Sequence, residues 1–374
     1  MKIAIHNDPK APTPFAGNWA CYLVQSGVEV KWVNLRLPDA IDQVTGCQGV
    51  MWHWEYMPHE RQVAVSILRA IETYLGIPVF PNLDTCWHYD DKIAQFYIFR
   101  ALDLTTPKTW VFWDREPAYE WARNAAYPKV FKLKTGSSSS NVHLVTTVHD
   151  ALQIIDLMFR SGTFPRGFKK VTRELDLLPS KRRKLPAAAS RLIQTLRLAI
   201  RATAISPPER FWWQVEKNYV YFQDFIAGNA GDIRITVIGN RAFGIRRSNR
   251  PSDFRASGSK LCEFDPSQIP LECVRRAYRM SAALRAQSMA YDFLIDERGD
   301  PLLSEMSYIY DAAVMEKCEG YWDSQLAWFP GHMRPEAAHV EDFLEHIRGR
   351  KESSLCLSRN AELTQEHAPP AGDK

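Results

Sequence analysis

Two carboxylates and a hydroxyl are spaced to meet across a predicted β-hairpin. Apolar runs flank the turn-like sequence around Gly299, and a turn centred on Arg298-Gly299 places Asp292 opposite Glu305. Side chains alternate along a strand, so Ser307 falls on the same face as these two acids. Opposed carboxylates repel each other, whereas a hard divalent cation such as Mg²⁺ prefers oxygen ligands of this kind. The alternative interpretation is an exposed acidic face.

A second predicted hairpin carries arginines instead. A turn centred on Asn240-Arg241 places Arg234 opposite Arg247, with Asp232 on the same face. Opposed arginines repel unless an anion lies between them, and Arg255 follows shortly afterwards. Separate surface arginines are the alternative. One hairpin thus favours a cation and the other favours anions, and a metal-bound nucleotide together with an acidic substrate satisfies both.

A lysine and a serine-rich loop form a candidate phosphate site. Lys132 lies in a predicted strand, and Gly136, Ser137, Ser138 and Ser139 belong to the loop that follows it. Backbone N–H groups and hydroxyls of such a loop can surround phosphate oxygens, while lysine supplies a point charge. The alternative for this segment alone is a serine-rich hairpin tip.

Length and composition narrow the class of protein. The chain has 374 residues, enough for two or three lobes, and is 45% hydrophobic and 24% charged, as is usual for globular proteins. Its seven cysteines are scattered without a CxxC pair, which argues against a zinc site or disulfide framework and favours a cytoplasmic location. We expect no signal peptide, because a basic start followed by an apolar run is missing at the N-terminus, and no membrane span, because no stretch of 18 apolar residues occurs. We also expect no nucleic-acid partner, and the net charge of +4 is mildly basic.

The order of predicted elements gives a chain of mixed α/β (α+β) class. The first part alternates strands with helices, which predicts a parallel sheet, whereas the later strands pair as hairpins. We divide the chain into an α/β domain (1–85), a small lobe (86–150), a basic helical insertion (151–212), a larger lobe (213–349) and a disordered tail (350–374).

The insertion differs in charge from the rest of the chain. Residues 166–202 hold eleven Lys and Arg against two Asp and Glu, and they include a predicted amphipathic helix. Such a helix can lie on an anionic membrane, and we hypothesise that it docks at the inner membrane surface, where the acceptor would be lipid-linked or a cell-surface glycan precursor. The alternative is a solvated insertion that packs on its own domain.

Taken in series, these residues resemble the ATP-grasp superfamily, most closely its glutathione-synthetase-like and ribosomal-S6-modifying-ligase-like branch. The resemblance covers about residues 88–310. It rests on the order Asp91-Lys92, Lys132 with its loop, Phe222–Ile226, Asp232-Ile-Arg234, Arg247, Arg255, Asp292 and Glu305. The chain departs from the pattern at Ser307, where such ligases usually have asparagine, and in the basic insertion.

The resemblance implies an ATP-grasp fold, in which a pre-ATP-grasp domain precedes two α+β lobes that clasp ATP. It also implies residue roles. Lys92 and Lys132 would hold the ATP phosphates, and Gly136, Ser137, Ser138 and Ser139 would close over them. Gln223, Asp224, Phe225 and Ile226 would meet adenine, and Asp232 would reach the ribose. Asp292, Glu305 and Ser307 would hold Mg²⁺, while Arg234, Arg247 and Arg255 would act on the acyl phosphate or the substrate carboxylate.

The activity implied is that of an ATP-dependent ligase, which joins a small-molecule carboxylate, such as an amino acid, to an amine through an acyl phosphate. Two alternatives remain open. The first is a kinase on the same fold that phosphorylates a hydroxyl. The second is a nucleotide-binding or membrane-docking protein without catalysis. Relatives of this kind are commonly homodimers, so a homodimer is a further expectation.

Overall fold

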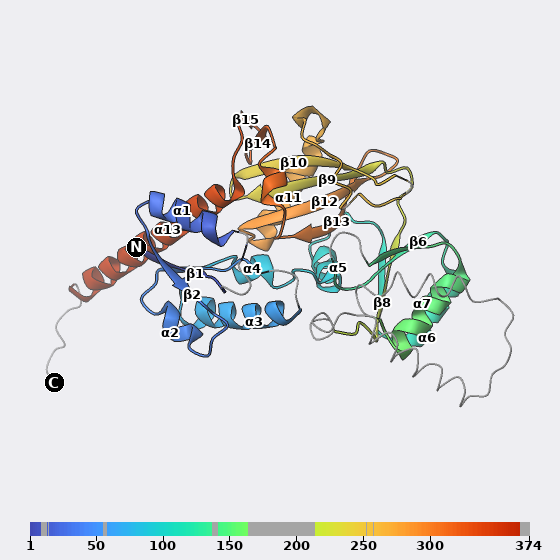
Figure 1. Ribbon diagram of the computed structural model, residues 1–374, viewed down its shortest axis with the longest axis horizontal. Coiled ribbons are helices and arrows are strands. Elements are labelled where there is room, and N and C mark those ends of the chain that lie inside the picture. Colours follow the sequence, from blue (N-terminus) through green and yellow to red (C-terminus); the bar gives the residue numbers. More distant parts are fainter. Residues whose placement is uncertain are drawn as a thin grey trace, which may run out of the picture.

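The structure is a computed structural model that describes residues 1–8, 13, 15–54, 58–136, 141–163, 214–251, 253–256 and 258–366. Within these residues the strands form three sheets, one parallel and two antiparallel. Figure 1 shows the parallel sheet and the small antiparallel sheet at opposite ends of the molecule, with the large sheet between them. The predicted α/β (α+β) class is confirmed.

The N-terminal unit is a parallel sheet of strand order β2-β1-β3-β4 with helices on its faces. Strands covered on both faces need apolar side chains throughout, and Ile3 and Ile5 are fully buried. Its elements are β1 (Lys2–His6), α1 (Ala16–Gln25), β2 (Glu29–Val33), α2 (Ala40–Val44), β3 (Gly49–Met51), α3 (Pro58–Arg69), a π-helical turn (Ala70–Tyr74), β4 (Val79–Phe80) and α4 (Leu83–Cys86).

The small lobe is an antiparallel sheet of order β5-β8-β6-β7, and three helices share its buried core, which contains Phe131 and Phe222. The sequence interpretation assigned β8 to the lobe that follows, but β8 lies between β5 and β6. Its elements are α5 (Lys92–Ala101), β5 (Thr109–Phe112), α6 (Arg115–Asn124), β6 (Lys129–Lys132), β7 (Val142–Val145), α7 (Val148–Arg160) and β8 (Val220–Asp224).

The large lobe is built on a sheet of order β13-β12-β9-β10-β14-β15, with β11 paired to β10. Its elements are β9 (Gly231–Ile238), β10 (Arg241–Ser248), β11 (Cys262–Glu263), a 3₁₀ turn (Pro266–Gln268), α11 (Leu271–Leu284), β12 (Ser288–Ile295), β13 (Pro301–Ser307), α12 (Ala312–Met315), β14 (Gly320–Trp322), β15 (Trp328–Pro330) and α13 (Pro335–Glu366).

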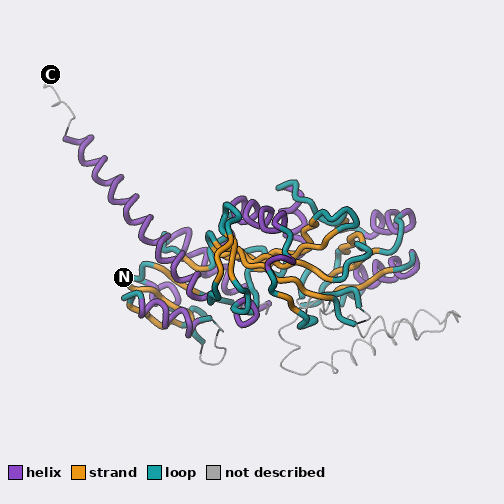
Figure 2. Tube along the Cα trace, turned by 90° about the horizontal axis from the view of Figure 1, so that it is seen from above, coloured by secondary structure: helices purple, strands orange, loops and turns teal. Residues whose placement is uncertain are grey.

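The last helix returns to the N-terminal unit. Asn18 on α1 donates a hydrogen bond of 2.8 Å to Glu336, and the Trp19 indole lies 3.3 Å from the His339 ring nitrogen. Beyond this contact α13 extends away from the body of the molecule (Figure 2). The expected tail thus begins inside a helix, which continues to Glu366. In the described part of the chain, no helix has both the length and the apolar character that a bilayer crossing requires.

The β12–β13 hairpin has the predicted register. Asp292 pairs with Glu305 and Ala290 with Ser307. The register holds because of a β-bulge next to Asp292, which leaves Ser304 as an extra residue on β13. Without this bulge, the pairing that starts at Ile295 and Pro301 would bring a different residue opposite Asp292.

The predicted register of the β9–β10 hairpin is wrong by two residues. The turn is centred on Gly239-Asn240, so Arg247 lies opposite Asp232 rather than opposite Arg234. Gly239 has a φ of +53°, which suits glycine at the first position of a two-residue hairpin turn. A shift of two residues keeps every side chain on its predicted face, but it replaces the expected repulsion between arginines with an ion pair.

Candidate functional site

A cavity of about 130 Å³ lies between the small sheet and the large sheet. Strands β6 and β8 form one wall, while β9, β12 and β13 form the other. Nine residues predicted from the sequence line it, namely Lys132, Gln223, Asp224, Phe225, Ile226, Asp232, Arg255, Asp292 and Glu305. Four further predicted residues lie beside it without lining it: Lys92 and Gly136, which bind each other, and Arg234 and Arg247, which bind Asp292. Ser137, Ser138, Ser139 and the basic segment 166–202 lie outside the described residues.

Lys132 is a buried cation at the end of β6. Its ammonium lies 3.5 Å from the Ser304 hydroxyl, and within the described residues no carboxylate lies within 4.0 Å of it. Burial lowers the pKa of Lys132 to about 8, because the charge lacks both water and a close counter-ion, and nearby Lys92 adds to this effect. An anion entering the cavity would find an uncompensated donor there.

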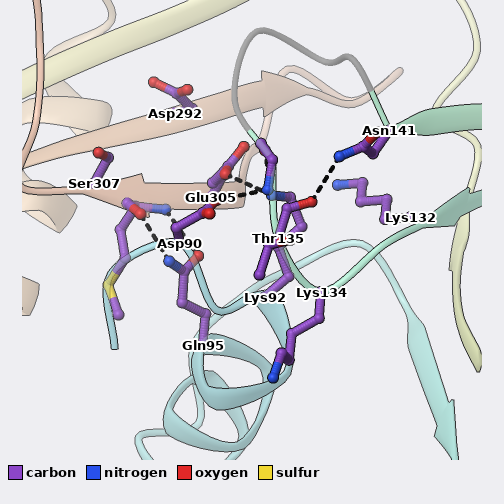
Figure 3. A network of polar contacts seen from close by, with 12 residues as sticks. Asp90, Lys92, Gln95, Lys132, Lys134, Thr135, Asn141, Asp292, Glu305 and Ser307 are labelled. Atoms are coloured by element: carbon purple, nitrogen blue, oxygen red, sulfur yellow. Dashed lines mark hydrogen bonds and ion pairs between the residues drawn. The ribbon is translucent and has the colours of Figure 1, made fainter. Parts of the chain in front are cut away.

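Lys92 is also buried, but it is neutralised. Its ammonium lies 3.1 Å from the Glu305 carboxylate and donates a hydrogen bond of 2.9 Å to the Gly136 carbonyl (Figure 3). Burial opposes the charged form, but Glu305 and Asp90 outweigh it and raise the pKa of Lys92. The cation therefore joins the first turn of α5, strand β13 and the start of the serine-rich loop.

The position of Lys92 follows from how α5 begins and docks. Asp91 caps the helix by accepting the Ala94 N–H at 3.0 Å. One turn later, the Gln95 side chain donates to the Met306 carbonyl at 2.8 Å and accepts the Met306 N–H at 3.2 Å. These bonds fix α5 against β13, as Figure 3 shows, and bring Lys92 to Glu305.

Asp90 holds the loop from the other side. Its carboxylate accepts the Gly136 N–H at 2.7 Å. Burial raises the pKa of Asp90 to about 6, although Lys92 opposes this shift. This residue was not predicted as a site residue, and its only sequence signal is its position immediately before the Asp91-Lys92 pair. The backbone of Gly136 is thus held on both sides, by Asp90 at its N–H and by Lys92 at its C=O.

Asp292 lies at the centre of a buried network of four charges. Arg234 binds it through two hydrogen bonds of 2.7 and 2.8 Å, and Arg247 lies 2.8 Å away. Arg247 also makes two bonds, of 2.6 and 2.7 Å, to Asp232. Although burial opposes ionisation, the two arginines lower the pKa of Asp292. The acidic hairpin therefore binds the basic hairpin directly, because Asp292 and Arg234 are cross-strand partners.

Arg255 and Asp224 each form an ion pair with another residue of the chain. The Arg255 guanidinium contacts the Asp253 carboxylate, and Asp224 contacts the buried Lys129 ammonium. Each member of these pairs can exchange its protein partner for a ligand only at the cost of the ion pair. In contrast to Lys132, these charges are neutralised by the protein itself.

The two serines of β13 have different surroundings. Ser304, the bulge residue, lines the cavity. The Ser307 hydroxyl donates to the Ile309 carbonyl at 2.8 Å and accepts the Ile309 N–H at 3.1 Å, and it does not line the cavity. The sequence could not reveal Ser304, because a bulge leaves no clear pattern in a short strand. In the described part of the chain, no cluster of three or more His, Cys, Asp and Glu is arranged for a metal.

Comparison with known proteins by sequence gives one short match. No protein-family model matches the chain. One curated relative, the D-alanine–D-alanine ligase of Lawsonia intracellularis, is 37% identical over 71 residues, a match that spans 19% of this chain and 23% of that ligase.

Solved structures match over nearly the whole chain. A RimK-domain ATP-grasp protein from Sphaerobacter thermophilus gives a TM-score of 0.51 at 15% identity over 92% of this chain and 99% of its own. The D-alanine–D-alanine ligase of Bacillus anthracis gives 0.54 at 13% identity over 94% and 99%. The ATP-grasp ligase PsnB, solved with its minimal precursor, Mg and ADP, gives 0.54 at 11% identity over 92% and 98%. The chain has the ATP-grasp fold.

Proposed function

We propose that this chain, with its ATP-grasp fold, is an ATP-dependent ligase that joins a carboxylate to an amine. The observation that carries the proposal is the cavity between the two antiparallel sheets, which gathers six residues predicted to contact the nucleotide, two predicted to hold the metal and one predicted to act on the substrate. The cavity contains a buried lysine without a close carboxylate, which is the feature that a triphosphate would satisfy. The ligases among the similar structures agree with this proposal.

The proposed nucleotide contacts follow the walls of the cavity. The segment Gln223–Ile226 leaves the small sheet at the cavity and would meet adenine through its backbone. Asp232 would reach the ribose. Lys132 would bind a phosphate oxygen, and Lys92 would do so if it exchanged Glu305 for the phosphate. Gly136, which Asp90 and Lys92 hold in place, would begin the loop over the phosphates.

The cavity also offers donors suited to a magnesium ion. Asp292 and Glu305 are direct cross-strand neighbours, and both line the cavity. Carboxylate oxygens are the hard ligands that Mg²⁺ prefers. These two residues would hold the ion, which supplies neutralisation of the phosphate charge. Ser307 belongs to the predicted set, but it does not line the cavity, so we assign the ion to the two carboxylates, which do.

Arg234 and Arg247 restrain Asp292 in a fixed position, since three hydrogen bonds or ion pairs reach its two oxygen atoms. We propose that they orient the carboxylate and lend positive charge to the transferring phosphoryl group. Arg255, which lines the cavity beside Asp253, would bind the carboxylate substrate. Ligase chemistry of this kind depends on positioning and charge neutralisation rather than on a covalent nucleophile.

The reaction proposed has two steps. A substrate carboxylate oxygen attacks the γ-phosphorus of ATP, so that an acyl phosphate forms and ADP leaves. The amine then attacks the acyl carbon and displaces phosphate, with loss of one proton, which gives the amide. The positively charged groups around the cavity would stabilise the negative charge in both steps.

The test is a screen of amino acids and amino sugars, added singly and in pairs, for ADP release. The proposal expects a pair whose combined rate greatly exceeds that of either member alone, together with a product whose mass is the sum of both substrates minus water. A product that carries one phosphate instead indicates a kinase. Tight ATP binding without turnover of any substrate set would contradict catalysis.

A further inference from the structure

A second, larger cavity lies on the other side of the residues that hold Gly136. It has a volume of about 550 Å³, within the range of small-molecule sites, and it shares no lining residue with the nucleotide cavity. Helix α3, the turn before α5, the end of β6 and the segment before β8 form its walls. Its charged and aromatic lining residues include Arg61, Trp87, Trp113, Lys134, Glu216 and Lys217.

The carboxylates in this wall are already satisfied by the protein. Glu216 accepts the Thr135 hydroxyl at 2.7 Å and the Tyr219 hydroxyl at 2.9 Å. Asp90 accepts the Gly136 N–H. These acids are therefore bound to neutral donors rather than to the cations of the cavity.

The cations of the wall have fewer partners. Arg61 and Lys134 share one carboxylate, that of Asp91, at 3.1 and 4.0 Å. Lys217 is exposed, and within the described residues no carboxylate lies within 4.0 Å of its ammonium. Lys217 can therefore contact an anionic group in the cavity without giving up an ion pair within the described residues.

Two tryptophans add a flat, apolar surface. The side chains of Trp87 and Trp113 are 46% and 52% exposed, although both line the cavity. Exposed indole rings stack readily on other rings, and Val65 and Val215 extend the apolar wall. A cavity lined by both lysines and exposed indole rings suits a molecule that carries both a ring and a negative charge.

The wall also contacts the nucleotide site. Asp90 and Thr135 line this cavity; Asp90 accepts the Gly136 N–H, and Thr135 precedes Gly136 in the chain. Figure 3 shows Lys134 pointing away from Glu305, whereas Lys92 reaches it. A ligand that moves Asp90 or Thr135 would therefore move the Gly136 peptide, to which Lys92 is bonded.

We propose that this cavity is a second ligand site, which binds a ring-bearing organic carboxylate and is coupled to the nucleotide cavity through Asp90, Gly136 and Lys92. The coupling rests on the proposed function, but the site itself does not. Linkage requires that each ligand changes the affinity of the other by the same factor.

The test uses the full-length chain and 2-naphthoate as the probe, measured by isothermal titration calorimetry. The uncharged analogue 2-naphthamide is the matched control for charge. Saturable binding of the acid is expected, with the amide about tenfold weaker because it lacks the charged contact. Equal affinity for acid and amide, or no saturation by the acid, would overturn the site.

Substitutions of residues that line the cavity test whether 2-naphthoate binds there. Lys217→Gln and Trp113→Ala should each weaken 2-naphthoate binding at least about fivefold. Lys317→Gln and Trp32→Ala are matched controls, since both residues are exposed elsewhere, and they should leave the affinity unchanged. Equal losses in the cavity variants and the controls would place the probe outside this cavity and overturn the proposal.

The coupling is read from ATP affinity with and without saturating 2-naphthoate. We expect a change of at least about threefold in the wild type and none in Asp90→Ala, which lacks the bond to Gly136. An unchanged ATP affinity in the wild type would refute the coupling but would not refute the second ligand site. Probe binding in a protein that never binds ATP would refute the proposed function alone.

Discussion

Two buried lysines, one in the nucleotide cavity and one beside it, have opposite surroundings. Beside the cavity, at the start of α5, Lys92 binds Glu305 and the Gly136 carbonyl, and its pKa is raised. In the cavity, at the end of β6, Lys132 lies 3.5 Å from the Ser304 hydroxyl with no carboxylate of the described residues within 4.0 Å, and its pKa is lowered to about 8. A neutralised lysine stabilises the fold, whereas an uncompensated one costs stability and is retained for a ligand. Lys132 is thus the stronger candidate for binding an anion.

The largest effect is expected for Lys132, whose substitution should lower ATP affinity but raise the free energy of unfolding. Lys132→Met should weaken ATP binding about 10- to 100-fold, since a charge-assisted contact is lost. The same variant should gain about 1 to 3 kcal/mol in free energy of unfolding, because a buried charge is removed. The gain is present below pH 8 and shrinks as the pH rises from 8 to the ordinary lysine value. Calorimetry and urea denaturation measure the two quantities.

Lys108→Gln provides the matched control, because Lys108 is an exposed lysine of the same lobe. It should change neither ATP affinity nor stability. A Lys132→Met protein that is less stable than the wild type would show that Lys132 is neutralised in solution, and the contrast with Lys92 would disappear.

Lys92 should behave in the reverse manner. Lys92→Met leaves Glu305 without its cation, so the free energy of unfolding should fall by about 2 kcal/mol, less than for a wholly buried pair because Glu305 is partly exposed. Adding Glu305→Gln should recover most of the loss. A single variant as stable as the wild type would mean that the pair contributes nothing to the fold.

The lowered pKa of Lys132 predicts a proton linkage. At pH 9 about nine in ten Lys132 side chains are neutral if the pKa is about 8, and a bound phosphate favours the charged form. ATP binding should therefore take up close to one proton at pH 9 and much less at pH 6.5. Titrations in buffers of different ionisation enthalpy measure the uptake, and Lys132→Arg should abolish it. Equal uptake at both pH values would exclude Lys132 as its source.

The smallest effect concerns the serines of β13. Ser304→Ala should weaken ATP binding about threefold, since Ser304 lines the cavity beside Lys132. Ser307→Ala should change it less than about twofold, because the Ser307 hydroxyl is bonded to Ile309. If Ser307→Ala has the larger effect in the calorimeter, the hydroxyl turns into the cavity when ATP binds.

The hairpins show how far a sequence can predict this fold and site. Alternation along the strands placed Asp292, Glu305 and the arginines on their faces without error, because a shift of two residues does not change the face. The partner across the strands depends on the turn, and Gly239-Asn240 is a sequence signal for a two-residue turn. The predicted repulsion between arginines was wrong because the turn was placed one residue too late.

Burial and tertiary pairing could not be obtained from the sequence. Nothing in the local pattern distinguishes Lys92 from Lys132, since the difference arises when β13 brings Glu305 to one and not to the other. The role of Asp90 likewise depends on a contact with a loop forty-six residues away. Order along the chain pointed to nine residues that line one cavity, whereas their charge partners required the fold.

The most direct test is a crystal structure with a non-hydrolysable ATP analogue, from which the distance between the Lys132 ammonium and the nearest phosphate oxygen is measured. We predict a direct hydrogen bond of about 2.7 to 3.2 Å. A triphosphate bound beside Arg61 and Lys134 in the second cavity, with Lys132 still out of contact, would contradict the account.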